Sequence, residues 1–366
     1  MNGVLQVGPG ELLPGQFLPE TIYRLFGFGD GAGPLVEFGA GLLAAFLIAN
    51  LLLVLGAVTG PWLKRKLYAD FTQRYAINRV GPYGMLIIVA DAIRFLSKEL
   101  IVPENADRPA YDLAPIIMPF AALLGFGAIP MGSLFGIDFQ LADPEVGLAF
   151  VFAASSLSTL GLVVGGYASY NKYSFLSGLR AIAQSIAYEI PLVITGASVV
   201  LFAGTLRTSE IVAQQTETLA TVGGIAIPSW YAIVNPFAFV LFLTATLAEV
   251  GRNPFDAPEA PNEIVAGYMT EYSSVYFVLL YLAEFLHIFL GGALIATLFL
   301  GGPAGPVLPG LVWMIIKIML FFGLTQWARY SIPRVRIDQV ITVGWKGLLV
   351  LAFGNFVLTA ILVGFL

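Results

Sequence analysis

The chain has 366 residues, of which 58% are hydrophobic and only 11% are charged, and its mean hydropathy is +0.85. Soluble domains carry about 25% charged residues, so this composition excludes a soluble protein and indicates an integral membrane protein. The sequence has no cysteine and one histidine, His287. This excludes disulfides, thiolate metal sites and iron–sulfur ligation, and it argues against a metal site built from histidine.

Apolar stretches of about 18–26 residues recur along the chain, which is the length of a helix that crosses a bilayer. The expected fold is therefore an all-α polytopic membrane protein, with residues 1–366 as a single integral membrane domain. The eight expected spans are residues 35–58, 113–135, 147–167, 182–206, 236–247, 275–300, 311–327 and 345–365. The fifth is short and runs directly into Glu249.

A ninth apolar stretch, residues 83–101, carries charge along one side. The polar side consists of Asp91, Arg94, Lys98 and Glu99, and the apolar side of Leu86, Val89, Ile93 and Leu96. This pattern predicts an amphipathic helix at the membrane interface. The alternatives are a buried helix of the soluble type and a poor ninth span.

Basic residues predict the topology. Fifteen of the 18 Lys and Arg residues fall in four loop groups, residues 61–112, 168–181, 248–274 and 328–346. Because cytoplasmic loops are enriched in Lys and Arg, these groups are expected on the inner side and both termini on the outer side. Arg24 and Arg207 remain outside, and Lys317 falls within the seventh span.

The run from 248 to 284 concentrates charge; it reads AEVGRNPFDAPEAPNEIVAGYMTEYSSVYFVLLYLAE. It contains one arginine, Arg252, and six carboxylates: Glu249, Asp256, Glu259, Glu263, Glu271 and Glu284. An ion at the centre of a membrane helix costs about 2.5–3.5 kcal/mol even on lenient scales. A cluster of them suggests that protons or a polar substrate are handled here.

The prolines divide this run. Pro254, Pro258 and Pro261 disfavour a regular helix, so the carboxylates between them are expected on a shaped loop, with helix resuming near Ile264. Glu271 is then expected at the start of the sixth span. Glu284 is expected three to four turns further along it. The carboxylates thus step from the inner surface towards the middle of the bilayer.

Other ionisable residues are expected to join this group. Arg180, Gln184 and Glu189, at the entry to the fourth span and within it, are expected on one side of that helix. Burial raises the pKa of a carboxyl group, so buried carboxylates can exchange protons near neutral pH. His287 is one turn beyond Glu284 and is a candidate for a relay or for packing, and Lys317 is a candidate partner of a carboxylate. The alternative for the whole set is helix-end charges paired with arginines, and Lys64 and Lys66 fit a positive-inside anchor best.

Four separated motifs, in order, resemble one family. They are NRVGPYGMLIIVADAIRFLSKE, KYSFLSGLRAIAQSIAYEIPL, AEVGRNPFDAPE with EIVAGYMTEYSS and YLAEF, and RYSIPRVRIDQVITVGWKGLLVL. Together they resemble the membrane H subunit of NADH-quinone oxidoreductase, respiratory complex I, which is equivalent to subunit 1 of the mitochondrial enzyme. The resemblance covers about residues 62–351. The chain departs from the family pattern at Lys64, at Ala76-Ile77, at Gly251 and at Pro261.

The resemblance implies a role in quinone reduction and proton translocation. It implies quinone binding, of ubiquinone or menaquinone, by Arg65, Asp91, Arg252 and Asp256. It implies a proton-coupling path through Glu189, Glu249, Glu259, Glu263, Glu271 and Glu284. No metal site is implied, and NAD, FMN and iron–sulfur clusters belong to partner subunits. The implied partners are the quinone and iron–sulfur subunits of the hydrophilic arm and small membrane-arm subunits, in a prokaryotic inner membrane and without nucleic acid.

Two other functions remain open from the sequence. One is the homologous membrane subunit of an energy-converting hydrogenase or formate hydrogenlyase, with the same architecture and different electron partners. The other is a stand-alone proton-coupled transporter. Neither changes the expected fold or the residues expected to handle protons.

Overall fold

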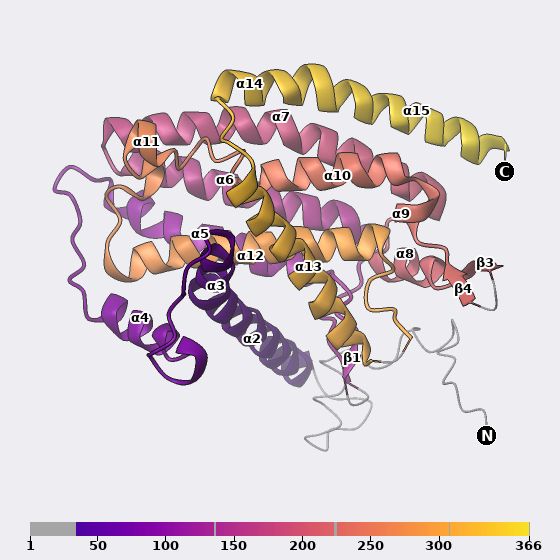
Figure 1. The fold of residues 1–366 in the computed structure, drawn as a ribbon, viewed down its shortest axis with the longest axis horizontal. Coiled ribbons are helices and arrows are strands. Elements are labelled where there is room, and N and C mark those ends of the chain that lie inside the picture. The colour runs from indigo at the N-terminus through magenta and orange to yellow at the C-terminus, as the bar shows by residue number, and fades with distance from the viewer. Residues whose placement is uncertain (1–33, 135–136, 223–224, 307, 366) are drawn as a thin grey trace.

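The computed structural model describes residues 34–134, 137–222, 225–306 and 308–365, and Figure 1 shows them as a bundle of helices. Within these residues, seven helices are long and apolar enough to cross a membrane, and α10 (Pro236–Glu249) is a shorter apolar helix. The all-α polytopic fold is therefore confirmed. Arg24 and the N-terminus lie outside the described residues, and which side the termini face stays a prediction.

The long helices follow the expected order. They are α2 (Pro34–Val58), α5 (Arg108–Phe126), α6 (Gly147–Ala168), α7 (Lys172–Ala203), α12 (Ser274–Phe299), α13 (Gly310–Ser331) and α15 (Leu349–Phe365). The shorter helices are α3 (Lys64–Phe71), α4 (Ile87–Leu96), α8 (Thr208–Gln215), α9 (Tyr231–Val234), α11 (Pro261–Ile264) and α14 (Ile337–Thr342). One π-helical turn, Thr59–Leu63, joins α2 to α3, and another, Val343–Leu348, joins α14 to α15.

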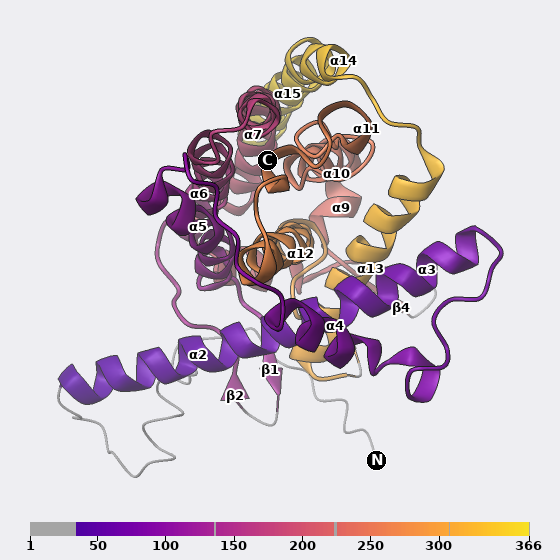
Figure 2. The same ribbon diagram turned by 90° about the vertical axis from the view of Figure 1, so that its left-hand side faces the viewer.

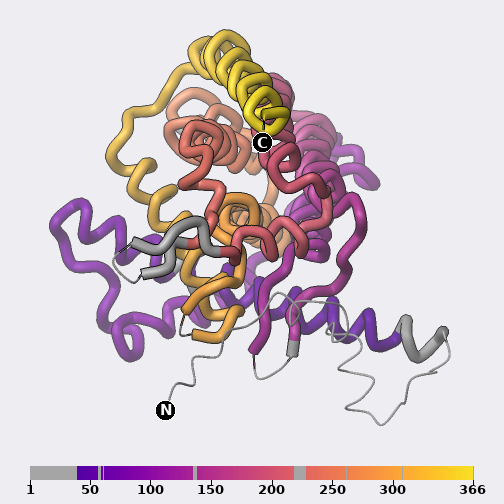
Figure 3. Tube along the Cα trace, turned by 90° about the vertical axis from the view of Figure 1, so that its right-hand side faces the viewer, coloured from indigo at the N-terminus to yellow at the C-terminus, as the bar shows by residue number. Residues whose placement is uncertain are grey.

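Helix α12 is the centre of the bundle. Figure 2 looks nearly along it and shows α5, α6 and α7 on one side, α10 and α13 on the other, and α2 crossing below. In its most apolar stretch 67% of the residues are buried, against 28% for α2 and 22% for the last span. Figure 3 shows the last span, in yellow, at the periphery of the molecule. A charge on α12 is thus surrounded by protein rather than by lipid.

Hydrogen bonds bring the four basic loop groups to one end of the bundle, where Asn171 of the second group donates to Glu271 of the third. Tyr111 donates its hydroxyl hydrogen to the Glu271 carbonyl, and Ser274 donates to the carbonyls of Phe95 and Lys98. The backbone N–H of Val335 donates to the Pro254 carbonyl. The opposite end carries α8, α9 and two short antiparallel hairpins, β1 (Ser133–Leu134) with β2 (Ile137–Asp138) and β3 (Thr218–Val222) with β4 (Ile225–Pro228).

Several expected boundaries were wrong, for reasons of local backbone chemistry. The second span begins five residues earlier than expected and its helix ends at Phe126 rather than continuing to 135, because a turn with Pro130 and a left-handed Gly132 (φ 87°) follows. The fourth begins at Lys172 rather than at 182, and Pro191 does not interrupt it. The last is preceded by α14 and a π-helical turn, so the helical run begins at Ile337.

The run after the prolines also differs from the expectation. Only one helical turn, α11, forms near Ile264, and a 3₁₀ turn at Gly267–Met269 follows it. The left-handed backbone of Val265 (φ 65°) and Gly267 (φ 59°) stops the helix there. Helix resumes only at Ser274, so Glu271 lies before the span and not in it.

The amphipathic stretch forms a shorter helix than residues 83–101. It is α4, which has no buried residue and leaves Val89, Ile93 and Leu96 more than half exposed. The 3₁₀ turn Pro82–Gly84 precedes it, and the indole N–H of Trp62 donates to the Tyr83 carbonyl. These contacts hold α4 beside the ends of α2 and α12 at the basic end of the bundle, with its apolar side outward.

Glycines allow the helices to approach closely, as is usual where lipid supplies no hydrophobic driving force between helices. In α6, a Cβ added at Gly166 would lie 2.6 Å from the Ser174 carbonyl oxygen, and one at Gly161 would lie 2.6 Å from the Met118 side chain. The Ser174 oxygen is backbone within α7 and cannot move aside as a side chain can. The contact between α6 and α7 therefore requires glycine at 166.

We expect Gly166→Ala to destabilise the chain by about 1–3 kcal/mol, the usual cost of overpacking. Gly323→Ala in α13 is the matched control, because no atom lies within 4 Å of the added Cβ; it should be neutral or mildly stabilising. Thermal unfolding of the purified variants in detergent measures both. Equal melting temperatures for the two variants would contradict this account of the α6–α7 contact.

Candidate functional site

A buried ion pair joins the proline loop to the central helix. Arg252 Nη2 lies 2.7 Å from Glu284 Oε2, and the side chains are 3% and 10% exposed. The guanidinium of Arg252 also lies 5.0 Å from the centre of the Phe285 ring. Removing one member of a buried pair costs about 3–5 kcal/mol because the other charge is left unpaired. The position of the loop therefore depends on this pair.

Side chains of α7 hold the same loop from the other side. Gln184 Nε2 donates to the carbonyls of Ala248 (2.8 Å) and Phe255 (2.7 Å). Ser177 Oγ donates to the Pro258 carbonyl at 2.5 Å. Gly251 takes a left-handed backbone conformation (φ 66°), which glycine adopts without strain. In the resulting loop, Arg252 is buried against Glu284 of α12, and Asp256 is buried as well.

Lys64 lies next to the ion pair. Its Nζ donates to the Tyr281 hydroxyl at 3.1 Å and lies 5.2 and 5.5 Å from the ring centres of Tyr281 and Phe285. Burial, and then the nearby charges of Arg252 and Arg329, lower the pKa of Lys64 to about 7. The positive-inside anchor expected for this residue does not describe these contacts.

Asp256 is the buried acid of the loop. Burial, and then the nearby Glu284 charge, raise its pKa to about 6 in spite of neighbouring arginines. Its Oδ1 has no hydrogen-bond partner among residues 34–134, 137–222, 225–306 and 308–365. A carboxyl group in this state can change its protonation within the physiological pH range.

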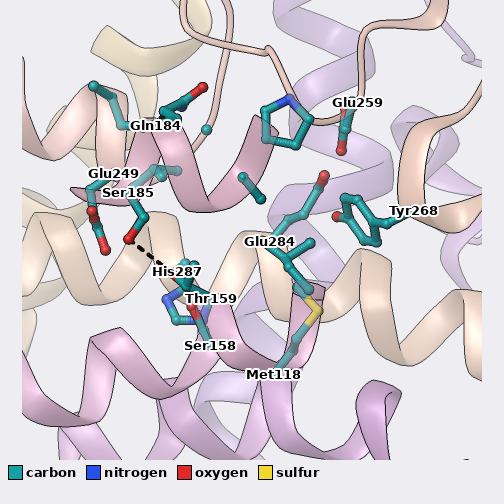
Figure 4. Close-up of a pocket in the computed structure, with 16 residues that line it drawn as sticks. Met118, Ser158, Thr159, Gln184, Ser185, Glu249, Glu259, Tyr268, Glu284 and His287 are labelled. Atoms are coloured by element: carbon teal, nitrogen blue, oxygen red, sulfur yellow. Dashed lines mark hydrogen bonds between the residues drawn. The ribbon is translucent and has the colours of Figure 1, made fainter. Parts of the chain in front are cut away.

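A small cavity opens between α5, α6, α7, the end of α10 and α12 (Figure 4). Three carboxylates line it, Glu249, Glu259 and Glu284, together with Tyr268 and His287. Its volume is about 70 Å³, room for a few water molecules, whereas pockets for small organic ligands measure about 300–1,000 Å³. The cavity therefore suits water and protons rather than a quinone ring.

Glu249 and His287 also line a second cavity of about 20 Å³. Glu249 Oε2 and His287 Nε2 are buried, and neither has a hydrogen-bond partner in the described part of the chain. Buried polar atoms of this kind are usually satisfied by ordered water. Glu249 and His287 therefore lie between two small cavities, each large enough to hold water molecules.

Hydroxyl groups connect this cavity to Glu189 on α7. Ser156 donates a hydrogen bond to Glu189 Oε1, and Ser185 donates to Glu189 Oε2 at 3.2 Å. Thr159 donates to Ser185 at 3.2 Å, and Figure 4 shows this bond at the edge of the cavity. Glu189 lies near enough to Glu249 for their charges to repel. These groups form a polar line between two carboxylates on different helices.

The remaining predicted site residues lie apart from the cavity. Glu263 is 43% exposed and pairs with Arg180 at 2.6 Å and Arg334 at 3.4 Å. The hydrogen bond from Arg180 lowers the pKa of Glu263, which keeps it charged. Glu271 accepts a hydrogen bond from the Asn171 side chain.

Arg65 and Asp91 form an ion pair of 2.9 Å between α3 and α4. Arg65 is adjacent to Lys64 in the chain, and its positive charge disfavours the charged form of Lys64. The pair therefore sits close to the Arg252–Glu284 pair without belonging to the cavity lining.

Among the described residues Lys317 pairs with no carboxylate, contrary to one expectation. Its Nζ donates to the carbonyls of Leu300, Gly302 and Ala304 at 2.6–2.9 Å, at the C-terminal end of α12. Helix C-termini leave carbonyl groups unsatisfied and favour a cation there. Lys317 thus closes the opposite end of the bundle from the charge cluster.

Sequence reasoning missed some of the polar groups. The line of hydroxyls on α6 and α7 has a weak signal in the run Ser155, Ser156, Ser158 and Thr159, four polar residues inside one apolar span. Lys64 had no such signal, because its partners lie far along the chain. Residues from four separate segments meet at this site, which is a property of the fold.

No group of three or more His, Asp or Glu side chains suited to a metal ion is found among the residues that the structure describes. The fold and the site therefore define a polytopic helical membrane protein whose interior holds an ion pair, carboxylates and a cavity of the size of water. Such buried ionisable groups usually mark a proton or ion pathway.

Comparison with known proteins shows the family. A family model described as NADH dehydrogenase matches residues 42–360. The NADH-quinone oxidoreductase H subunit of Thermomicrobium roseum is 42% identical over 324 residues, covering 87% of this chain and 94% of the relative. The H subunit of Bacillus cereus is 43% identical over 334 residues, covering 89% and 94%, and that of Dehalococcoides mccartyi is 41% identical over 319 residues, covering 87% and 84%. The chain belongs to the H-subunit family of NADH-quinone oxidoreductase, the membrane subunits of respiratory complex I.

The raised pKa of Asp256 predicts a pH-dependent stability. Since the folded state binds this proton more tightly than the unfolded state, Asp256 lowers the free energy of unfolding as the pH rises from about 4 to about 6. We expect Asp256→Asn to stabilise the chain at pH 7.5, by on the order of 3 kcal/mol. The difference should vanish at pH 4.

Thermal unfolding in detergent at both pH values measures this effect. Glu145→Gln, at the opposite end of the bundle where the side chain is 89% exposed, is a control for a general effect of removing a carboxylate. A destabilised Asp256→Asn variant at pH 7.5 would show that the ionised carboxylate is a net stabilising group.

Proposed function

We propose that this chain forms one wall of the quinone-binding chamber of the complex and begins the buried carboxylate path that couples quinone reduction to proton translocation. The observation that carries the proposal is the Arg252–Glu284 pair, one member on the inner loop and the other on the central helix beside a water-sized cavity. A change of charge at the loop is felt directly by a carboxylate inside the bundle.

The carboxylate path is supported by the arrangement of Glu249, Glu259 and Glu284 around one cavity. Protons move along chains of water and side-chain hydroxyls, and the hydroxyls of α6 and α7 extend the polar line to Glu189. Glu271 and Glu263 lie nearer the loop surface. For these two, a place on the proton path remains the prediction drawn from the family resemblance.

The quinone chamber is supported by polar groups of residues that do not line this small cavity. Arg252 Nε and Asp256 Oδ1 are buried and have no hydrogen-bond partner within the described ranges, which offers one donor and one acceptor to a polar head group. The Arg65–Asp91 pair lies on the neighbouring α3 and α4. Because the 70 Å³ cavity cannot hold a quinone ring, we place the quinone on the loop side, in a chamber completed by the hydrophilic arm.

The proposed partners follow from a quinone chamber that this chain forms only in part. The quinone and iron–sulfur subunits of the hydrophilic arm would cover the loop end, and small membrane-arm subunits would cover the exposed apolar sides. NAD, FMN and the iron–sulfur clusters would be bound by those partners, with ubiquinone or menaquinone as substrate. The location proposed is the inner membrane of a prokaryote.

The relatives carry the name of the NADH-quinone oxidoreductase subunit, which favours this function over the two alternatives. A hydrogenase-type complex would use the same proton path with other electron partners. Co-purification with mass spectrometry of the partners separates the three functions, since a transporter would be purified and active alone.

Glu249→Gln tests the proton path. The amide keeps the shape of the side chain but cannot exchange a proton, so we expect proton translocation, and with it coupled quinone reduction, to fall by about tenfold or more. The complex should assemble normally. Measurements are NADH-driven quinone reduction and proton uptake in closed vesicles.

Glu145→Gln is the matched control, since Glu145 lies in an acidic turn at the opposite end and is 89% exposed. It should behave as wild type. Normal quinone reduction and a normal ratio of protons to electrons in Glu249→Gln would refute the proposed path.

A further inference from the structure

Lys64 is the first residue of α3, just after the π-helical turn that ends the first membrane helix. It is half-buried, whereas Arg65 beside it is exposed. The side chain reaches inward to Tyr281 and Phe285 on α12, so the amine lies under the bundle and not in the basic surface. A lysine that serves only as a positive anchor would instead extend to water.

Tyr281 contacts Lys64 and lies one helical turn before Glu284 on α12. Its hydroxyl accepts the hydrogen bond from Lys64 Nζ at 3.1 Å and keeps its own hydrogen free to donate. Tyr281 precedes Glu284 by three residues on α12, so the two side chains lie on the same face of the helix. Phe285 is approached by both cations, Lys64 at 5.5 Å and Arg252 at 5.0 Å.

The charges around Lys64 come from several elements. The groups that act on it are Arg252 of the loop, Arg329 of α13, Glu284 of α12 and Arg65 of α3. The three arginines and burial lower the pKa of Lys64 and Glu284 raises it, with a result of about 7. A lysine on the protein surface stays charged near neutral pH, whereas burial and the neighbouring arginines favour the neutral form of this amine.

We propose that Lys64 is a proton-exchanging residue of the coupling site, which passes a proton through the Tyr281 hydroxyl to Glu284. The inference rests on the proposed function and adds an inner end to its carboxylate path. The sequence does not indicate this role, because Lys64 belongs to a basic run at the end of a membrane helix, which membrane topology alone explains. The geometry that supports it is the contact of one amine with the hydroxyl that precedes Glu284 on the central helix.

The transfer balances simply. The ammonium of Lys64 loses one proton to the Tyr281 oxygen as the Tyr281 hydroxyl gives its own to the Glu284 carboxylate. One N–H bond and one O–H bond break, and two O–H bonds form, one on Tyr281 and one on Glu284. Lys64 becomes neutral, Glu284 becomes a neutral acid, and Arg252 loses its charged partner. The proton step therefore loosens the contact that holds the loop.

The test compares Lys64→Met and Lys64→Arg in the assembled complex. Methionine keeps the length without charge, and arginine keeps the charge but does not release its proton. We expect both variants to reduce quinone at least about tenfold more slowly than wild type at pH 6. The ratio of wild-type to variant rate should fall towards one above pH 8, with a midpoint near 7, where wild-type Lys64 becomes neutral.

Controls separate this inference from the function on which it rests. Lys66→Met changes a lysine on the same helix that bonds the Asn78 side chain, and it should match wild type. NADH oxidation by a soluble artificial acceptor, which bypasses the quinone, reports assembly. Tyr281→Phe should lower the rate as Lys64→Met does.

Two outcomes would overturn the inference. Wild-type rates in Lys64→Arg would show that a fixed charge suffices, and a rate ratio independent of pH would show a structural role. If Glu249→Gln is impaired in the same preparations while the Lys64 variants are not, the proposed function stands and only the role of Lys64 falls.

Discussion

The structure depends on one buried contact, the ion pair between Arg252 and Glu284. Taking two charges out of water costs several kcal/mol per ion, which is recovered only when each charge has its partner. Arg252 lies on a loop that the prolines keep out of helix, and Glu284 lies on the most buried helix of the bundle. The pair therefore fixes the irregular proline loop against the rigid helix α12. Gln184 and Ser177 complete the support from α7.

The surrounding groups differ in how freely they can change charge. At the surface, Glu263 is held ionised by Arg180 and Arg334. Beneath the bundle, Asp256 and Lys64 have pKa values of about 6 and about 7, because burial penalises their charged forms. The loop thus has a fixed ionic contact at its surface, whereas Asp256 on the loop and Lys64 on α3 can gain or lose protons near neutral pH. This is the property required where a redox reaction and a proton path meet.

Much of the fold could be predicted from the sequence, since the length of an apolar run follows from the thickness of the bilayer. The helix ends could not, because they depend on single backbone conformations. The left-handed Val265 and Gly267, which delay α12 to Ser274, are one case. The other is the last span, whose helical run begins at Ile337 with α14 and a π-helical turn.

The candidate site was predictable in part for a similar reason. Glu249, Arg252 and Glu284 lie within one short run, and their cost in a membrane marks them directly. Lys64 comes to the site from a segment far away in the sequence. Basic residues at a helix end already have a sufficient explanation in topology. The hydroxyls that approach Glu189 are individually ordinary in a membrane helix. Only their packing against α7 joins them to the carboxylates.

The most direct test of this account is a double-mutant cycle on the ion pair, with Arg252→Met, Glu284→Gln and both together. Unfolding free energy in detergent and quinone reduction by the assembled complex are measured for each. We expect each single variant to lose about 3–5 kcal/mol and the double variant to recover at least about 2 kcal/mol of it, while quinone reduction stays impaired in all three. Additive losses of stability, or normal quinone reduction in the double variant, would contradict the claim that this pair both positions the loop and couples it to the bundle.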